Sequence, residues 1–130
     1  MNRKAEELKA RTAAFAKGVI DLCDKVESTQ AGRTITRQLI DAATAVNANY
    51  RAACRARSRA EFIAKLGTVC EEADECCGWL DLLVSSRLLK QEQVAALHQE
   101  ADELTAIFTA SVRTAKSRSG RTRTKSPISE

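Results

Sequence analysis

The chain is poor in residues that interrupt helices, with one proline and five glycines among 130 residues. Aromatic residues contribute only 4%, whereas alanine, leucine, glutamate, arginine and lysine are abundant. These abundant side chains lose little conformational freedom in a helix. The composition therefore favours long helices, and the length suits one domain with a single hydrophobic core.

Sequence signals for membrane insertion or secretion are missing as well. No run of apolar residues approaches the roughly 18 that are needed to cross a bilayer. Residues 1–15 lack a continuous apolar core and include Glu6 and Glu7, which argues against a secretory signal. We therefore expect a cytoplasmic protein without a membrane partner.

The cysteines and the single histidine form no recognisable disulfide or metal pattern. The cysteines are Cys23, Cys54, Cys70, Cys76 and Cys77. Their number is odd, two are adjacent, and no pair has the C-x-x-C spacing. A site that included His98 would need residues distant in the sequence to converge, so we expect no metal and no cofactor. The thiols are interpreted as reduced, small apolar side chains of a cytosolic core.

Motifs for catalysis are also absent from the sequence. The glycines are scattered, which excludes a glycine-rich phosphate loop. Bundles that hold a carboxylate-bridged metal pair use Glu-x-x-His, but Ala95 stands three residues before His98. A general base needs an oriented partner and a pocket, and neither is indicated for His98. We therefore expect no enzymatic activity and no catalytic residues.

Four segments carry apolar residues at alternating steps of three and four, which predicts amphipathic helices. They cover approximately residues 8–26, 35–53, 62–83 and 94–115. At two places the spacing does not decide which of two adjacent residues belongs to the apolar stripe: Asn49 or Tyr50, and Cys76 or Cys77. Four long helices with short connections pack most simply as an up-down-up-down antiparallel bundle. The expected fold is therefore an all-α four-helix bundle over residues 1–116.

Residues 117–130, SRSGRTRTKSPISE, contrast with this pattern because Ile128 is their only apolar residue. Such a segment cannot bury enough surface to offset the entropy of ordering, so we expect a disordered basic tail. Residues 113–130 hold six basic and one acidic residue, whereas residues 1–112 hold 15 basic and 16 acidic residues. This charge asymmetry suggests an anionic partner such as nucleic acid.

Residues 47–66, NANYRAACRARSRAEFIAKL, join the second and third predicted helices and hold the densest positive charge. Ser58 and Glu61 have the spacing of a capping box, which predicts a helix start at Ser58. Antiparallel packing would bring this corner beside the start of the first helix and the end of the fourth. The candidate nucleic-acid-binding residues at this basic end are Arg51, Arg55, Arg57, Arg59, Arg113, Lys116, Arg118, Arg121, Arg123 and Lys125.

Two of these interpretations have structural alternatives. The arginines could pair with Glu61 or with acidic groups of another subunit instead of binding an anion. Tyr50, one turn before the cluster, could stack on a base or pack in the core near the end of the bundle.

Residues 48–83, ANYRAACRARSRAEFIAKLGTVCEEADECCGWLDLL, resemble the signature of the 23S rRNA intervening-sequence proteins. EADEL at residues 100–104 fits as well, and residues 6–116 are compatible with that family. The resemblance implies a compact bundle that assembles as a homopentamer. A similar bundle, the accessory protein of diversity-generating retroelements, works with a reverse transcriptase and nucleic acid. The pair Cys76-Cys77 departs from the family, where an aromatic residue is common before the tryptophan, and suggests a repacked core.

These observations lead to a functional hypothesis and one alternative. The first is a non-enzymatic, oligomeric protein that associates with RNA or DNA, as an accessory factor to rRNA or to a reverse transcriptase. The alternative is a scaffold whose basic corner binds an acidic protein surface without nucleic acid.

Overall fold

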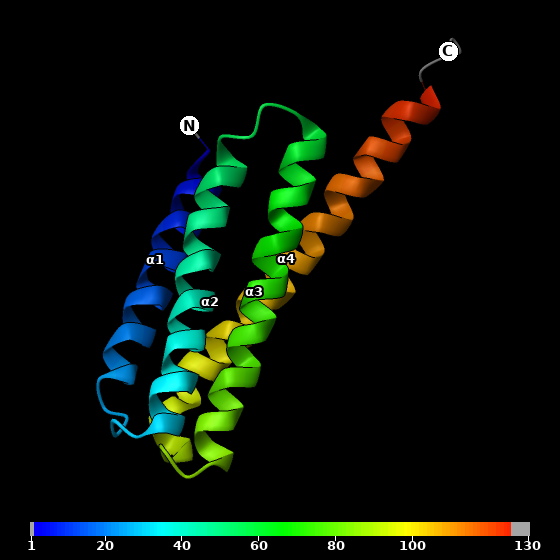
Figure 1. Ribbon diagram of the computed structural model, residues 1–130. Helices are drawn as coiled ribbons and strands as arrows, with labels where there is room; N and C mark the ends of the chain where they lie inside the picture. The colour runs from blue at the N-terminus through cyan, green and yellow to red at the C-terminus, as the bar shows by residue number, and fades with distance from the viewer. Residues whose placement is uncertain (1, 126–130) are drawn as a thin grey trace.

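The computed structural model describes residues 2–125, with side chains through Arg118. Within this range the chain forms four helices: α1 (Arg3–Cys23), α2 (Gln30–Cys54), α3 (Arg59–Ser85) and α4 (Gln91–Lys125). Successive helices run in opposite directions and are joined by short connections (Figure 1). The expected all-α, up-down-up-down antiparallel bundle is confirmed. None of the helices in the described range is both long and apolar enough to cross a membrane.

Polar caps fix where α2 and α3 begin. The Thr29 side chain accepts a hydrogen bond from the Gly32 N–H at 3.0 Å, and Ser58 accepts one from the Glu61 N–H at 3.0 Å. The Glu61 carboxylate in turn accepts from the Arg57 N–H at 3.0 Å. The predicted capping box is therefore present. It differs from the usual motif in that the Glu61 carboxylate accepts from the residue before the N-cap, not from the N-cap residue Ser58 itself.

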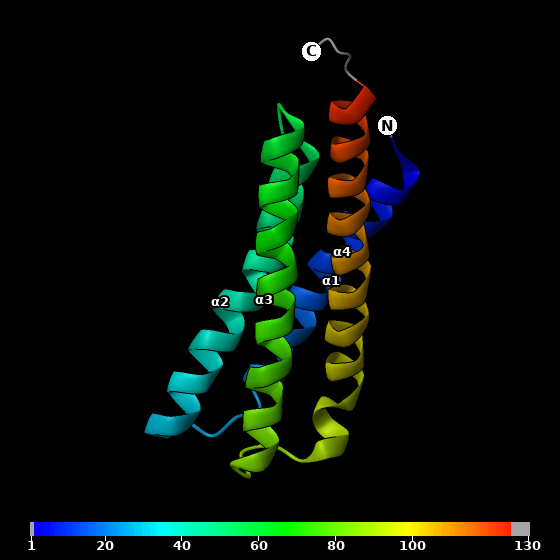
Figure 2. The ribbon, with the colours of Figure 1, turned by 90° about the vertical axis from the view of Figure 1, so that its right-hand side faces the viewer.

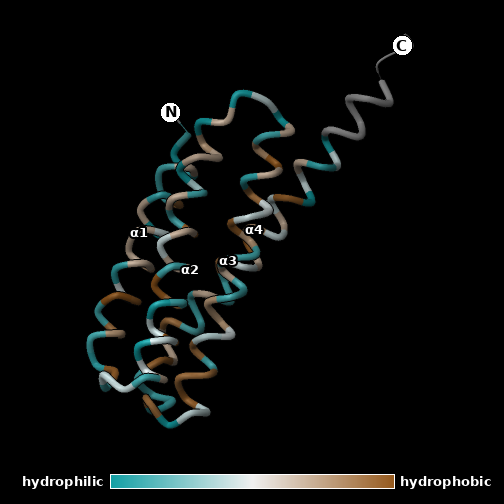
Figure 3. Tube along the Cα trace, viewed as in Figure 1, coloured by the Kyte–Doolittle hydropathy of each residue, from teal (hydrophilic) through white to brown (hydrophobic). Residues whose placement is uncertain are grey.

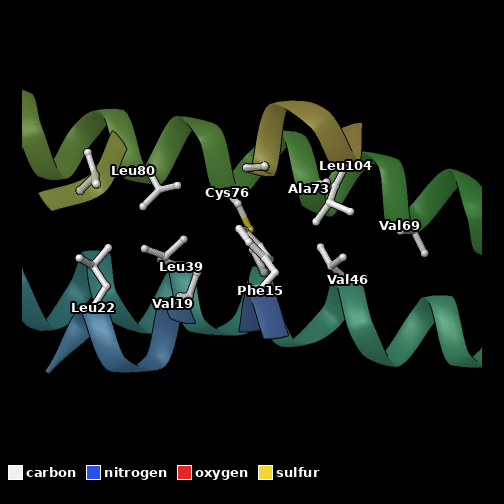
Figure 4. Close-up of a cluster of buried hydrophobic side chains, with 14 of the residues drawn as sticks. Phe15, Val19, Leu22, Leu39, Val46, Val69, Ala73, Cys76, Leu80 and Leu104 are labelled. Atoms are coloured by element: carbon white, nitrogen blue, oxygen red, sulfur yellow. The ribbon is translucent and has the colours of Figure 1, made fainter. Parts of the chain in front are cut away.

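The core lies along the bundle axis and takes residues from all four helices. Hydrophobic positions recur along each helix between hydrophilic ones (Figure 3). In the centre, Phe15 of α1 and Cys76 of α3 point toward one another (Figure 4). The residues around them are Val19, Leu22, Leu39, Val46, Val69, Ala73, Leu80 and Leu104, all buried. The predicted apolar stripes are thus the core, and Tyr50 and Cys76 occupy the two positions that the sequence left open.

Among the described residues, one polar side chain is buried in this core. Thr12 of α1 is fully buried, and its hydroxyl donates to the Leu8 carbonyl at 2.9 Å. The same oxygen accepts from Nδ2 of Asn47 on α2 at 3.0 Å. Because both hydrogen-bonding capacities are used, the buried hydroxyl joins α1 to α2 without the penalty of an unpaired polar group.

Helix α4 is the longest element, and Figure 1 shows its last turns leaning away from the other helices, although it stands beside α3 in the view of Figure 2. Ala115 is still buried, whereas Lys116 and Arg118 are exposed. The helix continues to Lys125, although the sequence analysis expected disorder from residue 117. Adding residues to an existing helix needs no new nucleus, and no proline interrupts the sequence before Pro127. Residues 126–130 of the expected tail lie outside the described range.

The connection from α3 to α4 begins with a tight helix stop. The Leu88 N–H donates to the Leu83 carbonyl at 2.9 Å, and the Arg87 N–H donates to the Val84 carbonyl at 2.9 Å. This pair of bonds is the Schellman motif, which places a residue in the left-handed conformation. Here that residue is Arg87, with φ of 61°. An L side chain in this conformation costs about 1 kcal/mol or more, whereas glycine adopts it freely.

Replacing Arg87 with glycine is therefore expected to raise the free energy of unfolding by about 0.5–1 kcal/mol, even though glycine gains freedom in the unfolded chain. Urea unfolding followed by circular dichroism measures the change. Arg37→Gly is the matched control, because Arg37 is exposed inside α2. That control should lose about 1 kcal/mol. A loss of stability in both variants would contradict the strain assigned to Arg87.

Candidate nucleic-acid interface

The start of α1, the turn between α2 and α3, and the C-terminal half of α4 lie at the same end of the bundle (Figure 1). We call this region the basic end. Its candidate residues with described side chains are all exposed: Arg51, Arg55, Arg57, Arg59, Arg113, Lys116 and Arg118. Arg121, Arg123 and Lys125 lie on the terminal turns of α4, beyond the side chains that the structure describes.

A groove of about 1080 Å³ opens at the basic end and is lined by residues from all four helices. Its basic lining residues are Lys4, Lys9, Arg55, Arg59 and Arg118. Of the predicted residues with described side chains, only Arg55, Arg59 and Arg118 are brought together around it. Lys4 and Lys9, at the start of α1, complete the basic lining but were not among the predicted binding residues. The other described candidates are exposed elsewhere and do not line the groove.

The groove also has an apolar lining that the sequence analysis did not predict. Leu8, Phe62 and Ile107 contribute to it and are half-buried. Tyr50 lies at the edge of the core beside them, with its ring 5.2 Å from that of Phe108 at an angle of 46°. Only 6% of Tyr50 is exposed, so the core interpretation is confirmed and its ring face is covered. Burial raises the pKa of the Tyr50 hydroxyl above its ordinary value.

Most of the basic side chains that the structure describes at the basic end have no carboxylate partner among the described residues. Among the described residues, no carboxylate lies within 4.0 Å of Arg51, Arg55 or Arg59. The predicted pairing with Glu61 occurs only at Arg57, whose Nε lies 4.0 Å from Glu61 Oε1 and whose side chain is 92% exposed. An exposed pair at this distance contributes little stability and neutralises little charge.

Two basic residues in the first half of α1 are paired instead. Arg11 donates from Nε to Glu100 at 2.6 Å and from Nη2 to Glu100 at 2.8 Å and to Glu103 at 2.7 Å. These hydrogen bonds raise the Arg11 pKa, so the guanidinium stays charged. Lys9 lies 2.8 Å from Glu6. Arg11 therefore joins α1 to α4 and adds little free charge to the basic end.

Sequence reasoning missed a polar cluster between α3 and α4, nearer the opposite end. Cys77 Sγ donates to Asp102 Oδ1 at 3.1 Å, and His98 Nδ1 lies 3.4 Å from Asp102 Oδ2. His98 Nε2 lies 2.9 Å from Asp81 Oδ1. Burial, together with the hydrogen bond to Asp102, raises the pKa of the Cys77 thiol to about 12. The sequence pattern that could have revealed this cluster is a spacing of four residues on each helix. Cys77 and Asp81 have this spacing on α3, and His98 and Asp102 have it on the neighbouring antiparallel α4.

The other cysteines follow the expectation only in part. Cys23 and Cys76 are buried in the core, and burial raises their pKa values to about 11 and about 12. Cys54 is exposed, and Cys70 Sγ lies 3.0 Å from Thr109 Oγ1. The interpretation as apolar core thiols therefore holds for Cys23 and Cys76, while Cys77 belongs to the polar cluster.

Comparisons with known proteins agree with the resemblance carried by residues 48–83. The sequence model of the 23S rRNA-intervening sequence proteins matches residues 6–110. The fold is similar to the crystal structure of a protein of unknown function from the S23 ribosomal protein family of Bacteroides thetaiotaomicron, with a TM-score of 0.78 and 27% identity. That similarity covers 85% of this chain and 98% of the other. No curated protein matches the chain. Because the family match spans most of the bundle, the chain belongs to the 23S rRNA-intervening sequence protein family.

Proposed function

We propose that the protein is a non-enzymatic, oligomeric bundle that associates with RNA or DNA through its basic end. The observation that carries this proposal is the exposed and largely unpaired positive charge around the groove, from Arg55 and Arg59 at one corner and Lys4 and Arg118 on other helices. Neutralising phosphates with such side chains releases counterions, which gives affinity for nucleic acid of any sequence.

The lining of the groove supports binding rather than catalysis. Among the described residues that line it there is neither a histidine nor a carboxylate that could act as a general base. Tyr50 is buried and its ring packs against Phe108, so it offers no platform for a base. Affinity should therefore come from phosphate contacts and depend little on base sequence.

We further propose that copies of the chain assemble as a homopentamer, the state that the family resemblance implies. Five copies would present five basic ends, so that binding at one end raises the effective concentration of nucleic acid at the others. Light scattering tests the assembly against the chain mass of 14.2 kDa. A uniform monomer at that mass would contradict the pentamer.

The purified protein is expected to bind fluorescein-labelled single-stranded RNA with an affinity that falls as salt rises. If each chain neutralises about four phosphates, a plot of log Kd against log salt should have a slope of about 3. Fluorescence anisotropy between about 50 and 200 mM salt measures this slope, since the effect is large in that range. A neutral four-helix bundle of similar size is the control. Binding no tighter than that of the control, or insensitive to salt, would contradict the proposal.

The apolar side chains in the groove favour a second candidate function. Leu8, Phe62 and Ile107 beside a basic rim would fit an amphipathic acidic segment of another protein, such as a reverse transcriptase. A pull-down from nuclease-treated lysate separates the two functions. A protein partner that is retained after nuclease treatment supports the scaffold, whereas loss of all partners with the nucleic acid supports direct binding of RNA or DNA.

A further inference from the structure

Two pairs of potential metal ligands face each other across the α3–α4 interface. Cys77 and Asp81 are four residues apart on α3, and His98 and Asp102 are four residues apart on α4. Residues at this spacing lie one above the other on the same helix face. The antiparallel arrangement therefore brings together a thiol, an imidazole and two carboxylates from four positions.

The distances within this cluster fit a small metal ion. The ligand atoms of Cys77, His98 and Asp102 all lie within 4.8 Å of one another. Asp102 is central, with Oδ1 at 3.1 Å from Cys77 Sγ and Oδ2 at 3.4 Å from His98 Nδ1. Ligands bound tetrahedrally at about 2.0–2.3 Å are separated by about 3.3–3.6 Å. The three side chains therefore lie close enough to surround one ion after side-chain movement, with one oxygen of Asp102 as its ligand.

The second nitrogen of His98 provides an independent indication. Nε2 is buried and makes no hydrogen bond to a described residue, although Asp81 Oδ1 lies only 2.9 Å away. A metal on Nδ1 would place the imidazole proton on Nε2, and a rotation of the His98 or Asp81 side chain would then aim it at this carboxylate. A histidine ligand whose other nitrogen donates to a carboxylate is the usual arrangement in zinc sites. The position of Asp81 thus matches a residue that orients the ligand.

We propose that Cys77, His98 and Asp102 bind a zinc ion, with Asp81 positioning His98. A thiolate and an imidazole suit zinc, whereas magnesium and calcium prefer oxygen ligands. Water would complete the tetrahedron, because the chain supplies three ligands. The ion would join α3 to α4 away from the basic end, so the site does not depend on the function proposed there.

Titration of the full-length protein with Co²⁺ tests this site. The wild-type protein is expected to bind one Co²⁺ per chain and to show both thiolate-to-cobalt charge-transfer absorption and the strong visible bands of four-coordinate cobalt. An equivalent of Zn²⁺ should abolish both. The charge-transfer absorption should be lost in Cys77→Ser. Cys54→Ser is the matched control, because Cys54 is exposed and outside the cluster, and this variant should behave as wild type.

Three further variants test the remaining assignments. His98→Gln and Asp102→Asn should each weaken Co²⁺ binding at least tenfold, and Asp81→Asn should weaken it about 10- to 100-fold through the loss of its positioning bond. Zn²⁺ should raise the Tm of the wild type but not of the Cys77 and His98 variants, because only a site in the folded chain stabilises it. The absence of charge-transfer absorption in the wild type, its persistence in Cys77→Ser, or an unchanged Co²⁺ affinity in His98→Gln would overturn the site.

Discussion

Replacing Arg55 and Arg59 together with glutamine is expected to weaken RNA binding by about ten- to fiftyfold at about 0.1 M salt and to lower the salt slope by about 1.4. Both side chains are exposed, line the groove and have no described carboxylate within 4.0 Å. Their removal therefore breaks no internal ion pair, and the bundle should remain folded. Anisotropy titrations over a salt series measure both quantities, and in a pentamer the loss should be larger because every copy is changed.

The matched control removes the same charge from the other half of the bundle. Lys25 follows the end of α1 and Arg37 lies in the first half of α2, and both are exposed. The Lys25→Gln and Arg37→Gln double variant should change the affinity by less than about threefold, because charges beyond the Debye length of about 8–10 Å are largely screened. Equal losses in the two double variants would show that net charge alone attracts RNA, and would exclude the basic end as the binding surface.

The sequence predicted the fold well because few residues interrupt its helical pattern. The stripes containing Val19, Leu39 and Leu104 are buried as their spacing requires. Adjacent positions such as Cys76 and Cys77 point about 100° apart on a helix with 3.6 residues per turn, so periodicity alone could not choose between them. The choice depends on the rotation of each helix relative to its neighbours, which is decided by packing across the whole bundle.

The sequence predicted the candidate site only where the alternation of helix directions is enough to place a residue at one end of the bundle. Alternating helix directions place Arg55 and Arg118 at one end whatever the details of packing. The groove between them depends on the divergence of α4, and the Arg11–Glu100 pair depends on how α1 and α4 are rotated. The contact of Cys77 with Asp102 requires the axial register of α3 against α4. Tilt, rotation and register are properties of the packed bundle, and no single helix encodes them.

Truncating Phe108 to alanine is expected to lower the free energy of unfolding by about 3–5 kcal/mol. The Phe108 side chain is fully buried on α4 and packs against the Tyr50 ring of α2. Its removal loses apolar burial and an aromatic contact and leaves a cavity that the rigid helices can fill only in part. Natural domains have only about 5–15 kcal/mol of stability, so the variant should unfold at much lower urea concentration. Circular dichroism during urea titration measures the change.

Two variants distinguish this packing effect from a general sensitivity to losing apolar atoms. Phe108→Leu keeps most of the buried volume and should cost less than about half as much as the alanine variant, since the cost grows with the cavity that remains. Leu82→Ala removes a leucine side chain from α3, where the residue is 42% exposed in the single chain, and should change stability by less than about 0.5 kcal/mol. A loss at Leu82 as large as that at Phe108 would mean that this face of α3 is covered in solution. Since nothing in the described chain covers it, a second subunit would then have to pack there, and the dependence of that loss on protein concentration would reveal the contact.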